Sequence, residues 1–279
     1  MKKYVCLWMM FLVGSTCLKG QEVLDTMYLF CQYKSQGIKL TAQKKTNDVI
    51  RLEIGKTLSK SYSYETCRFD SAQATPGYSK RRVDAITKAR REGGEDWLER
   101  AFASFPKLLE TATVYKNYPK GKMMVLDRIN DTEYLYEDRM NTQEWQLQTD
   151  TMTIMGYLCQ KAVCEWRGRE YEAWFTPDIP VSEGPLKFGG LPGLIMKLSD
   201  NLQEWTYEIE GIQYLNRPIV MRAPVKGKAY QKTTRMKFLR GYRRFLNNMG
   251  AFIDASLEKP LGIKAGAGDK YDLMERDYR

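Results

Sequence analysis

The stretch from Gly184 to Ile195, GPLKFGGLPGLI, constrains the fold more than any other part of the chain. It is rich in glycine and proline, as surface loops are, but it also carries large apolar side chains, which such loops lack. Glycine permits unusual backbone angles and close approach, whereas the apolar side chains require burial. We therefore predict a tight, buried turn with a structural role, followed by a strand from Leu194. Its members are Gly184, Pro185, Phe188, Gly189, Gly190, Leu191, Pro192, Gly193, Leu194 and Ile195.

Most of the remaining chain alternates short β-prone runs with turn signals. Residues 48–55 alternate apolar and charged side chains, and residues 60–69 alternate tyrosine with polar residues, so both are expected to be strands. The pattern predicts a mainly β, β-rich α+β fold: a curved antiparallel sheet or half-barrel with a helical insertion and a C-terminal helix. We expect a single domain over residues 21–260, followed by a disordered tail at 261–279 that is rich in glycine and charge.

The helical insertion covers about residues 70–110. Its first helix, Lys80–Arg91, has apolar side chains at three-residue spacing and a broad basic face formed by Lys80, Arg81, Arg82, Lys88, Arg90 and Arg91. Two glycines separate it from a second helix over 95–105. The basic face is interpreted either as a solvated surface or as a docking element for an acidic partner or a membrane surface.

The first twenty residues have the pattern of a secretory signal peptide. A positive start precedes an apolar run over 5–13 and small or polar residues up to Gly20, where we expect cleavage. Lipid attachment at Cys17 is the alternative. Cleavage removes three lysines and no acid, so the formal charge falls from +10 to +7. The mature chain is thus expected to be periplasmic or secreted, or peripheral to the outer membrane.

The residue types limit the chemistry that the chain can carry out. The sequence contains no histidine, which excludes a Ser-His-Asp triad and zinc held by histidine, and we expect no metal or cofactor. Carboxylate-pair hydrolysis stays open, with Glu165, Glu170, Glu172 and Asp178 as candidates that no spacing distinguishes. The basic charge suits an anionic membrane surface or an acidic partner rather than nucleic acid after export, or is a soluble surface only.

Three basic residues lie in or near the glycine-rich stretch: Arg167, Arg169 and Lys187. Guanidinium and ammonium groups bind carboxylates and phosphates, so these residues indicate either an anion- or partner-binding site or an internal ion-pair network. In the second interpretation, Glu172 and Asp178 would supply the carboxylates that pin the turn.

Four cysteines remain after export: Cys31, Cys67, Cys159 and Cys164. An even number in an oxidising compartment suggests two disulfides, whereas at least one buried free thiol is the alternative. A Cys159–Cys164 bond is disfavoured because five residues of straight strand span about 16 Å, and a disulfide needs Cα atoms within about 7 Å.

The order of several motifs around the glycine-rich stretch resembles the GLPGLI family. The similarity covers roughly residues 152–198, including 156–162, 171–180 and the GLPGLI word itself at 190–195. The resemblance implies an exported, uncharacterised family, often encoded near outer-membrane transport proteins, without an assigned catalytic residue. We therefore expect a non-enzymatic accessory or binding protein that works with an outer-membrane transport protein. A periplasmic hydrolase that uses a carboxylate pair is the alternative; it requires two carboxylates in one open cleft.

Overall fold

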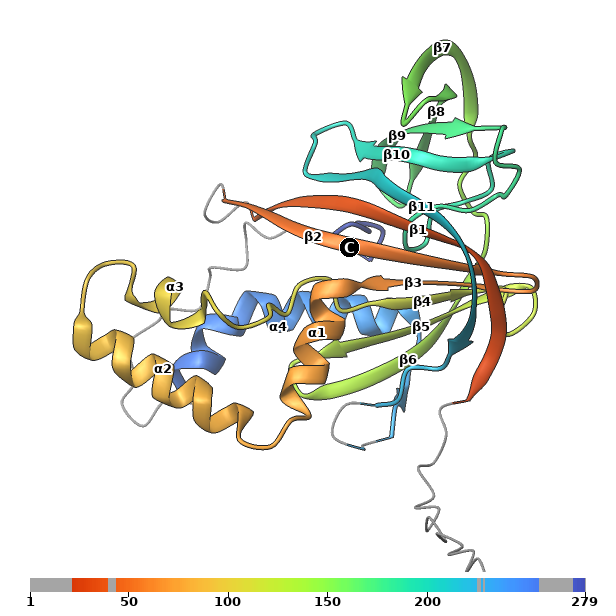
Figure 1. Cartoon of the computed structure of the whole chain (residues 1–279). Helices are drawn as coiled ribbons and strands as arrows, with labels where there is room; N and C mark the ends of the chain where they lie inside the picture. The colour runs from red at the N-terminus through yellow and green to blue at the C-terminus, as the bar shows by residue number, and fades with distance from the viewer. Residues whose placement is uncertain (1–21, 40–43, 225–226, 228, 256–272, 279) are drawn as a thin grey trace, which may run out of the picture.

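The computed structural model describes residues 22–39, 44–224, 227, 229–255 and 273–278. The expected signal peptide and Cys17 lie outside these residues. Figure 1 shows a large twisted sheet, two helices that extend away from it, and a long helix across its open side. In the described part of the chain, no helix is long and apolar enough to cross a membrane.

Twelve strands form one open sheet in the order β12-β6-β5-β4-β3-β2-β1-β11-β10-β9-β8-β7. All neighbouring strands pair antiparallel except β12 and β6, which are parallel. The mainly β prediction is confirmed, and the expectation of a purely antiparallel sheet is wrong at β12. The strands are β1 (Val23–Lys39), β2 (Lys44–Gly55), β3 (Ser59–Ser63), β4 (Thr113–Lys116), β5 (Lys122–Ile129), β6 (Thr132–Arg139), β7 (Gln146–Ile154), β8 (Tyr157–Trp166), β9 (Arg169–Thr176), β10 (Leu194–Asp200), β11 (Trp205–Val220) and β12 (Gln231–Lys232).

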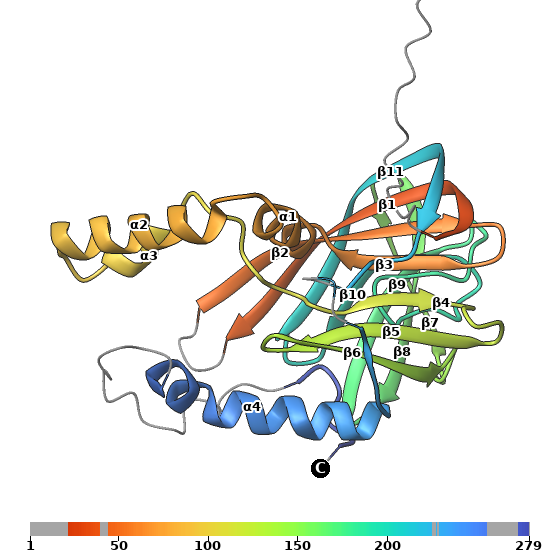
Figure 2. The ribbon, with the colours of Figure 1, turned by 90° about the horizontal axis from the view of Figure 1, so that it is seen from below.

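The described helices are α1 (Tyr64–Gln73), α2 (Tyr78–Glu92), α3 (Trp97–Phe102) and α4 (Arg235–Ala255). The third predicted strand, over 60–69, is wrong beyond Ser63. The Ser63 side chain accepts a hydrogen bond from the Thr66 amide at 3.0 Å and thereby caps α1, so the chain turns into a helix. Figures 1 and 2 show α2 and α3 as an arm that projects from the sheet.

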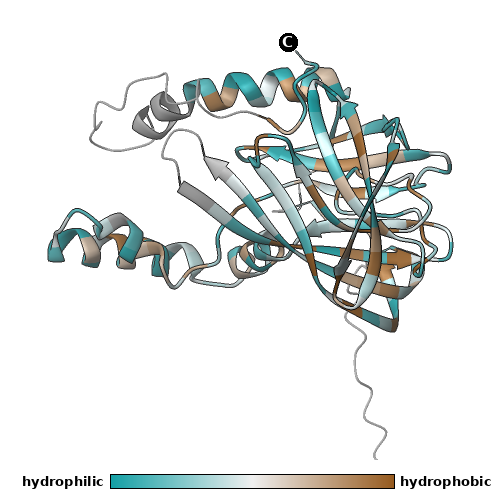
Figure 3. Ribbon diagram, turned by 90° about the horizontal axis from the view of Figure 1, so that it is seen from above, coloured by the Kyte–Doolittle hydropathy of each residue, from teal (hydrophilic) through white to brown (hydrophobic). Residues whose placement is uncertain are grey.

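Helix α4 lies along β5 and β6 (Figure 2). Phe238 of this helix is buried and packs against Tyr136 and Tyr134, with ring centroids 5.2 Å and 5.6 Å away. Every second residue of a strand points into the core, as Ile50 and Leu52 of β2 do. In Figure 3, the most apolar residues are concentrated in the sheet.

Residues 273–278 differ from the expected disordered tail. Leu273, Glu275 and Tyr278 are buried, and the segment lies against the turn between β8 and β9. Polar contacts hold it there: the Arg276 amide donates to the Arg167 carbonyl at 2.8 Å, and the Tyr171 hydroxyl donates to the Met274 carbonyl at 2.8 Å. Glycine and charge content predict disorder, but no local pattern reveals partners so distant in the chain.

Candidate functional site

The glycine-rich stretch leads from β9 to β10 and packs into the core. Phe188, Leu191, Leu194 and Ile195 are each at most 1% exposed. Two glycines are needed for different reasons. Gly190 has φ +86°, a left-handed conformation that suits glycine, whereas a Cβ on Gly193 would lie 2.1 Å from the Thr176 carbonyl oxygen.

Side chains from other elements bind the carbonyl groups of this stretch. The Lys116 ammonium of β4 donates to the carbonyls of Gly184 and Phe188 at 2.9 Å and 2.5 Å. Trp145 donates to the Gly189 carbonyl at 2.9 Å. Buried carbonyls that the turn cannot pair internally are therefore satisfied by side chains from β4 and from the segment before β7.

The three basic residues of the predicted anion site contact carboxylates of the same chain. The Lys187 ammonium binds Asp138 and Glu275, and Arg167 binds the same two carboxylates. Arg169 lies in a separate pair of contacts, with Asp200 at 2.7 Å and Glu204 at 2.6 Å. The structure thus brings Arg167 and Lys187 together.

The carboxylates expected from sequence proximity lie elsewhere. Glu172 pairs with Lys161 at 2.7 Å, and Asp178 is exposed. Glu165 and Glu170 are exposed and face each other across β8 and β9. With Glu172 they line a surface depression, separate from the cavity described below. Burial opposes ionisation of Glu172, but its hydrogen bonds to Lys161 and Trp174 lower its pKa, which does not suit a proton donor at neutral pH.

Disulfides are absent among the four cysteines expected to form them. Cys31, Cys67, Cys159 and Cys164 are all free. Cys67 is exposed on α1, whereas the other three are buried in strands, and Cys159 and Cys164 share the strand β8. Burial raises the pKa values of Cys31 and Cys164 to about 12, so these thiols are unreactive.

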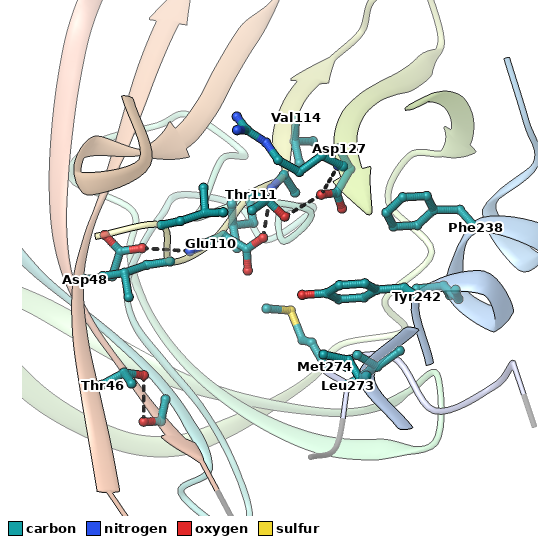
Figure 4. A pocket seen from close by; sticks show the side chains of 18 of the residues that line it. Thr46, Asp48, Glu110, Thr111, Val114, Asp127, Phe238, Tyr242, Leu273 and Met274 are labelled. Atoms are coloured by element: carbon teal, nitrogen blue, oxygen red, sulfur yellow. Dashed lines mark hydrogen bonds between the residues drawn. The ribbon is translucent and has the colours of Figure 1, made fainter. Parts of the chain in front are cut away.

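A cavity of about 530 Å³ lies between the sheet, the segment that precedes β4, and α4. Leu186 and Lys187 of the glycine-rich stretch reach it, as do Leu273, Met274 and Glu275. Figure 4 shows Phe238 and Tyr242 of α4 on the side of the cavity opposite Asp48. Aromatic and aliphatic side chains make up much of the lining: Trp205, Phe238, Tyr242, Phe245 and Leu246.

Three carboxyl groups that form no ion pair with a described residue also line the cavity: Asp48 from β2, Glu110 from the segment before β4, and Asp127 from β5. Asp48 accepts from the Glu110 amide at 3.2 Å, and Asp127 accepts from the Thr111 hydroxyl at 2.6 Å (Figure 4). The cavity therefore combines apolar side chains with three acids that form no ion pair in the described part of the chain, although Lys187 lies near enough to Glu110 and Asp127 to lower their pKa values in part.

Burial raises the pKa values of all three carboxyl groups. For Glu110 the pKa reaches about 7, because burial disfavours the charged form and the Asp127 carboxylate adds repulsion. The pKa values of Asp48 and Asp127 are raised by burial in spite of the hydrogen bonds that they accept. Glu110 therefore changes its charge near neutral pH.

We expect Glu110→Gln to flatten the dependence of stability on pH between about 5 and 8. The Glu110 carboxyl loses its proton near 4.5 when unfolded and near 7 when folded. Between these values the folded state holds the extra proton, so rising pH lowers the free energy of unfolding, by at most about 3 kcal/mol. Chemical denaturation of both proteins at pH 5 and pH 8 measures the difference. Glu165→Gln, on the exposed face of β8, is the control; an unchanged slope in Glu110→Gln would contradict the assignment.

Sequence reasoning missed the carboxyl groups of the cavity. Asp127 could have been noticed, because it interrupts the apolar run Met123–Leu126 in a predicted strand. Glu110 and Asp48 carried no such signal, since charged residues at the end of a helical insertion or in an alternating strand are ordinary. In the described residues, no cluster of Cys, Asp and Glu has the arrangement of a metal site.

Residues 164–197 match the model of a family described as a protein of unknown function (Porph_ging). This span overlaps the region that resembles the GLPGLI family, and it includes Arg167, Arg169 and Lys187. No curated protein matches the sequence. Among solved structures, PNGF-II is similar in two crystal forms, C2 and P21, with TM-scores of 0.49 and sequence identities of 14% and 13%. The matches cover 78% and 77% of this chain, which spans 32% and 33% of the PNGF-II chains.

Proposed function

We propose that this chain is an exported binding protein whose cavity holds a small ligand with an apolar body and a cationic group. The cavity's combination of aromatic side chains with three acids that form no ion pair among the described residues carries the proposal. Its volume, about 530 Å³, lies in the range of small-molecule sites. Resemblance to the exported GLPGLI family supports the location outside the cytoplasm.

A cationic group suits the acids of the cavity for an electrostatic reason. Burial raises the pKa values of Glu110 and Asp127 although Lys187 opposes the shift, and a bound cation would favour their ionised form further. Aromatic rings of the same cavity, such as Phe238 and Tyr242, offer apolar contact and cation–π attraction. An anionic ligand would instead meet the repulsion that already raises the pKa of Glu110.

Native mass spectrometry of protein purified from its own cells tests this proposal. We expect a bound small molecule that carries a positive charge, and we expect Glu110→Gln to reduce its occupancy. Glu165→Gln should leave the occupancy unchanged. A folded protein that returns without any bound molecule, or with the same molecule at equal occupancy in Glu110→Gln, would contradict the proposed site.

A carboxylate-pair hydrolase is the second candidate function. Glu110 and Asp127 share one cavity, and a carboxyl with a pKa of about 7 suits a general acid at neutral pH. This candidate predicts that chromogenic p-nitrophenyl glycosides or esters are cleaved, and that Glu110→Gln abolishes the cleavage. Binding without turnover favours the first function.

We further propose that α2 docks the protein to an anionic membrane surface near its transport partner. Lys80, Lys88, Arg90 and Arg91 are exposed on the arm that projects from the sheet. Arg81 and Arg82 are less available, because Arg81 binds the Pro76 carbonyl and the Thr75 hydroxyl, and the Arg82 guanidinium lies 4.9 Å from the Phe102 ring centroid.

The docking prediction concerns co-sedimentation with phosphatidylglycerol vesicles. Replacing the four exposed residues Lys80, Lys88, Arg90 and Arg91 by Gln should weaken binding at low salt by at least about tenfold, since each basic residue near the surface contributes about 1 kcal/mol. High salt should release the wild-type protein. The control replaces four exposed basic residues elsewhere, Lys34, Lys56, Lys120 and Arg217, by Gln. If both variants lose vesicle binding equally, the basic face of α2 is only a solvated surface.

A further inference from the structure

Three cations lie beside Asp138, near the turn between β8 and β9: Lys187, Arg167 and Arg235. We call this cluster the acceptor surface. The Glu275 carboxylate binds all three cations: one of its oxygens contacts Lys187, and the other contacts Arg167 and, at 2.7 Å, Arg235. Asp277 adds a two-pronged contact to Arg235 at 2.6 Å and 2.8 Å. Residues 273–278 thus supply two acids to a basic cluster of the folded domain.

The segment supplies much of the negative charge that the acceptor surface binds. Within the sheet, Lys187 and Arg167 form ion pairs with one carboxylate, Asp138. Glu110 and Asp127 interact with Lys187 through charge but form no ion pair with it. With the two acids of the segment in place, the Lys187 and Arg167 side chains are 7% and 9% exposed, so the segment both covers these cations and offsets their charge.

The backbone of the segment is also recognised. Arg169 donates from Nε and Nη2 to the Leu273 carbonyl at 3.2 Å, and Tyr171 donates to the Met274 carbonyl. Leu273 and Tyr278 are buried at the two ends. However, the segment forms no strand and pairs with no strand of the sheet. It is held as a bound peptide is held, by side chains of the host and by single backbone contacts.

We propose that this acceptor surface is a peptide-binding site for an acidic segment, and that residues 273–278 are its exchangeable resident ligand. A partner segment with the same chemistry, an apolar residue followed by two spaced acids and an aromatic residue, displaces the resident. Because Leu273, Met274 and Glu275 also line the cavity, displacement removes part of the cavity wall. The site does not depend on the cavity having a ligand.

The pKa values agree with a site built for carboxylates. Burial opposes ionisation of Glu275, yet Lys187 and Arg167 lower its pKa below the usual value. The same cluster lowers the pKa of Asp138 to about 2. The resident acids are therefore ionised at neutral pH, as the exchange with another acidic peptide requires.

A fluorescent peptide with the sequence Leu-Met-Glu-Arg-Asp-Tyr tests the site on the full chain. In Glu275→Gln/Asp277→Asn the resident segment is weakened, so the peptide should bind at least tenfold more tightly than to the wild type in an anisotropy titration. A peptide with Gln and Asn in place of the acids should bind this variant at least tenfold more weakly than the acidic peptide does. Equal affinity of the two peptides, or no binding to a variant with native circular dichroism, overturns the proposal.

Hydrogen exchange of the wild-type chain supplies a second test that needs no variant. Excess acidic peptide should speed up exchange at the amides of 273–278, such as that of Arg276, and leave the amides of β8 and β9 unchanged. The amide-substituted peptide should have no effect. If exchange in 273–278 is insensitive to excess acidic peptide, the segment is a permanent part of the fold and the proposal is wrong.

Discussion

Gly193→Ala should destabilise the protein by about 3 kcal/mol, although it adds a single methyl group. The new Cβ would lie 2.1 Å from the Thr176 oxygen and 2.6 Å from the Thr176 carbonyl carbon, both of them backbone atoms. The backbone has little freedom to retreat, because the next amide, of Leu194, donates to the Ile179 carbonyl at 3.0 Å. For a domain of this size, the loss corresponds to a decrease in Tm of about 6–12 °C.

Gly211→Ala is the matched control for the first prediction. Its Cβ would meet the Gln32 Cβ at 3.7 Å, an ordinary contact, so we expect Tm to change by at most about 2 °C. Differential scanning calorimetry compares the two variants with the wild type. If Gly193→Ala has the same Tm as the wild type but no longer binds its ligand, the glycine-rich stretch has a direct binding role instead of a structural one.

Lys187→Met should cost about 3 kcal/mol, because it removes a buried cation from two buried carboxylates. Arg167 and Arg235 remain to compensate the charges of these carboxylates. Lys187 contacts Asp138 and Glu275, and all three side chains are 6–7% exposed. The ionised Asp138 contributes its stability above the unfolded pKa of 3.8 and loses it as the pH falls towards about 2. The variant should therefore lose most stability at neutral pH and less in acid.

Lys122→Met is the matched control for this prediction. Lys122 pairs with Glu137 at 2.5 Å, but the two side chains are 56% and 48% exposed. Exposed pairs contribute at most about 1 kcal/mol, so denaturation by urea should show a much smaller loss in this variant. Similar losses in both variants would mean that the buried cluster is not held by its charges.

The sequence was informative where local chemistry decides the structure. The pattern predicts a basic helix over Lys80–Arg91, and α2 spans Tyr78–Glu92. Glycines flank this helix at both ends, and their conformational freedom lets the backbone leave the helix there. The sequence was misleading after Ser63. There, alternating tyrosines suit a strand, whereas one serine side chain caps a helix.

The candidate sites depended on contacts between residues far apart in the sequence. Lys187 binds Glu275, and no local pattern connects positions so distant. Glu172 and Asp178 lie close to the basic residues of the predicted anion site along the chain, but Glu172 pairs with Lys161 and Asp178 is exposed. The cavity has the same origin, since Asp48, Glu110 and Asp127 meet only when the sheet is assembled.

Calorimetric titration with dodecyltrimethylammonium below its critical micelle concentration tests the central claim, that the cavity binds an apolar ligand with a cationic group. At pH 8 the wild type should bind this probe at least tenfold more tightly than dodecyl sulfate, and binding should weaken at pH 6 as Glu110 takes up its proton. Glu110→Gln should lose this pH dependence, whereas Glu165→Gln should retain it. Equal binding of both probes, or an unchanged pH dependence in Glu110→Gln, would contradict the claim.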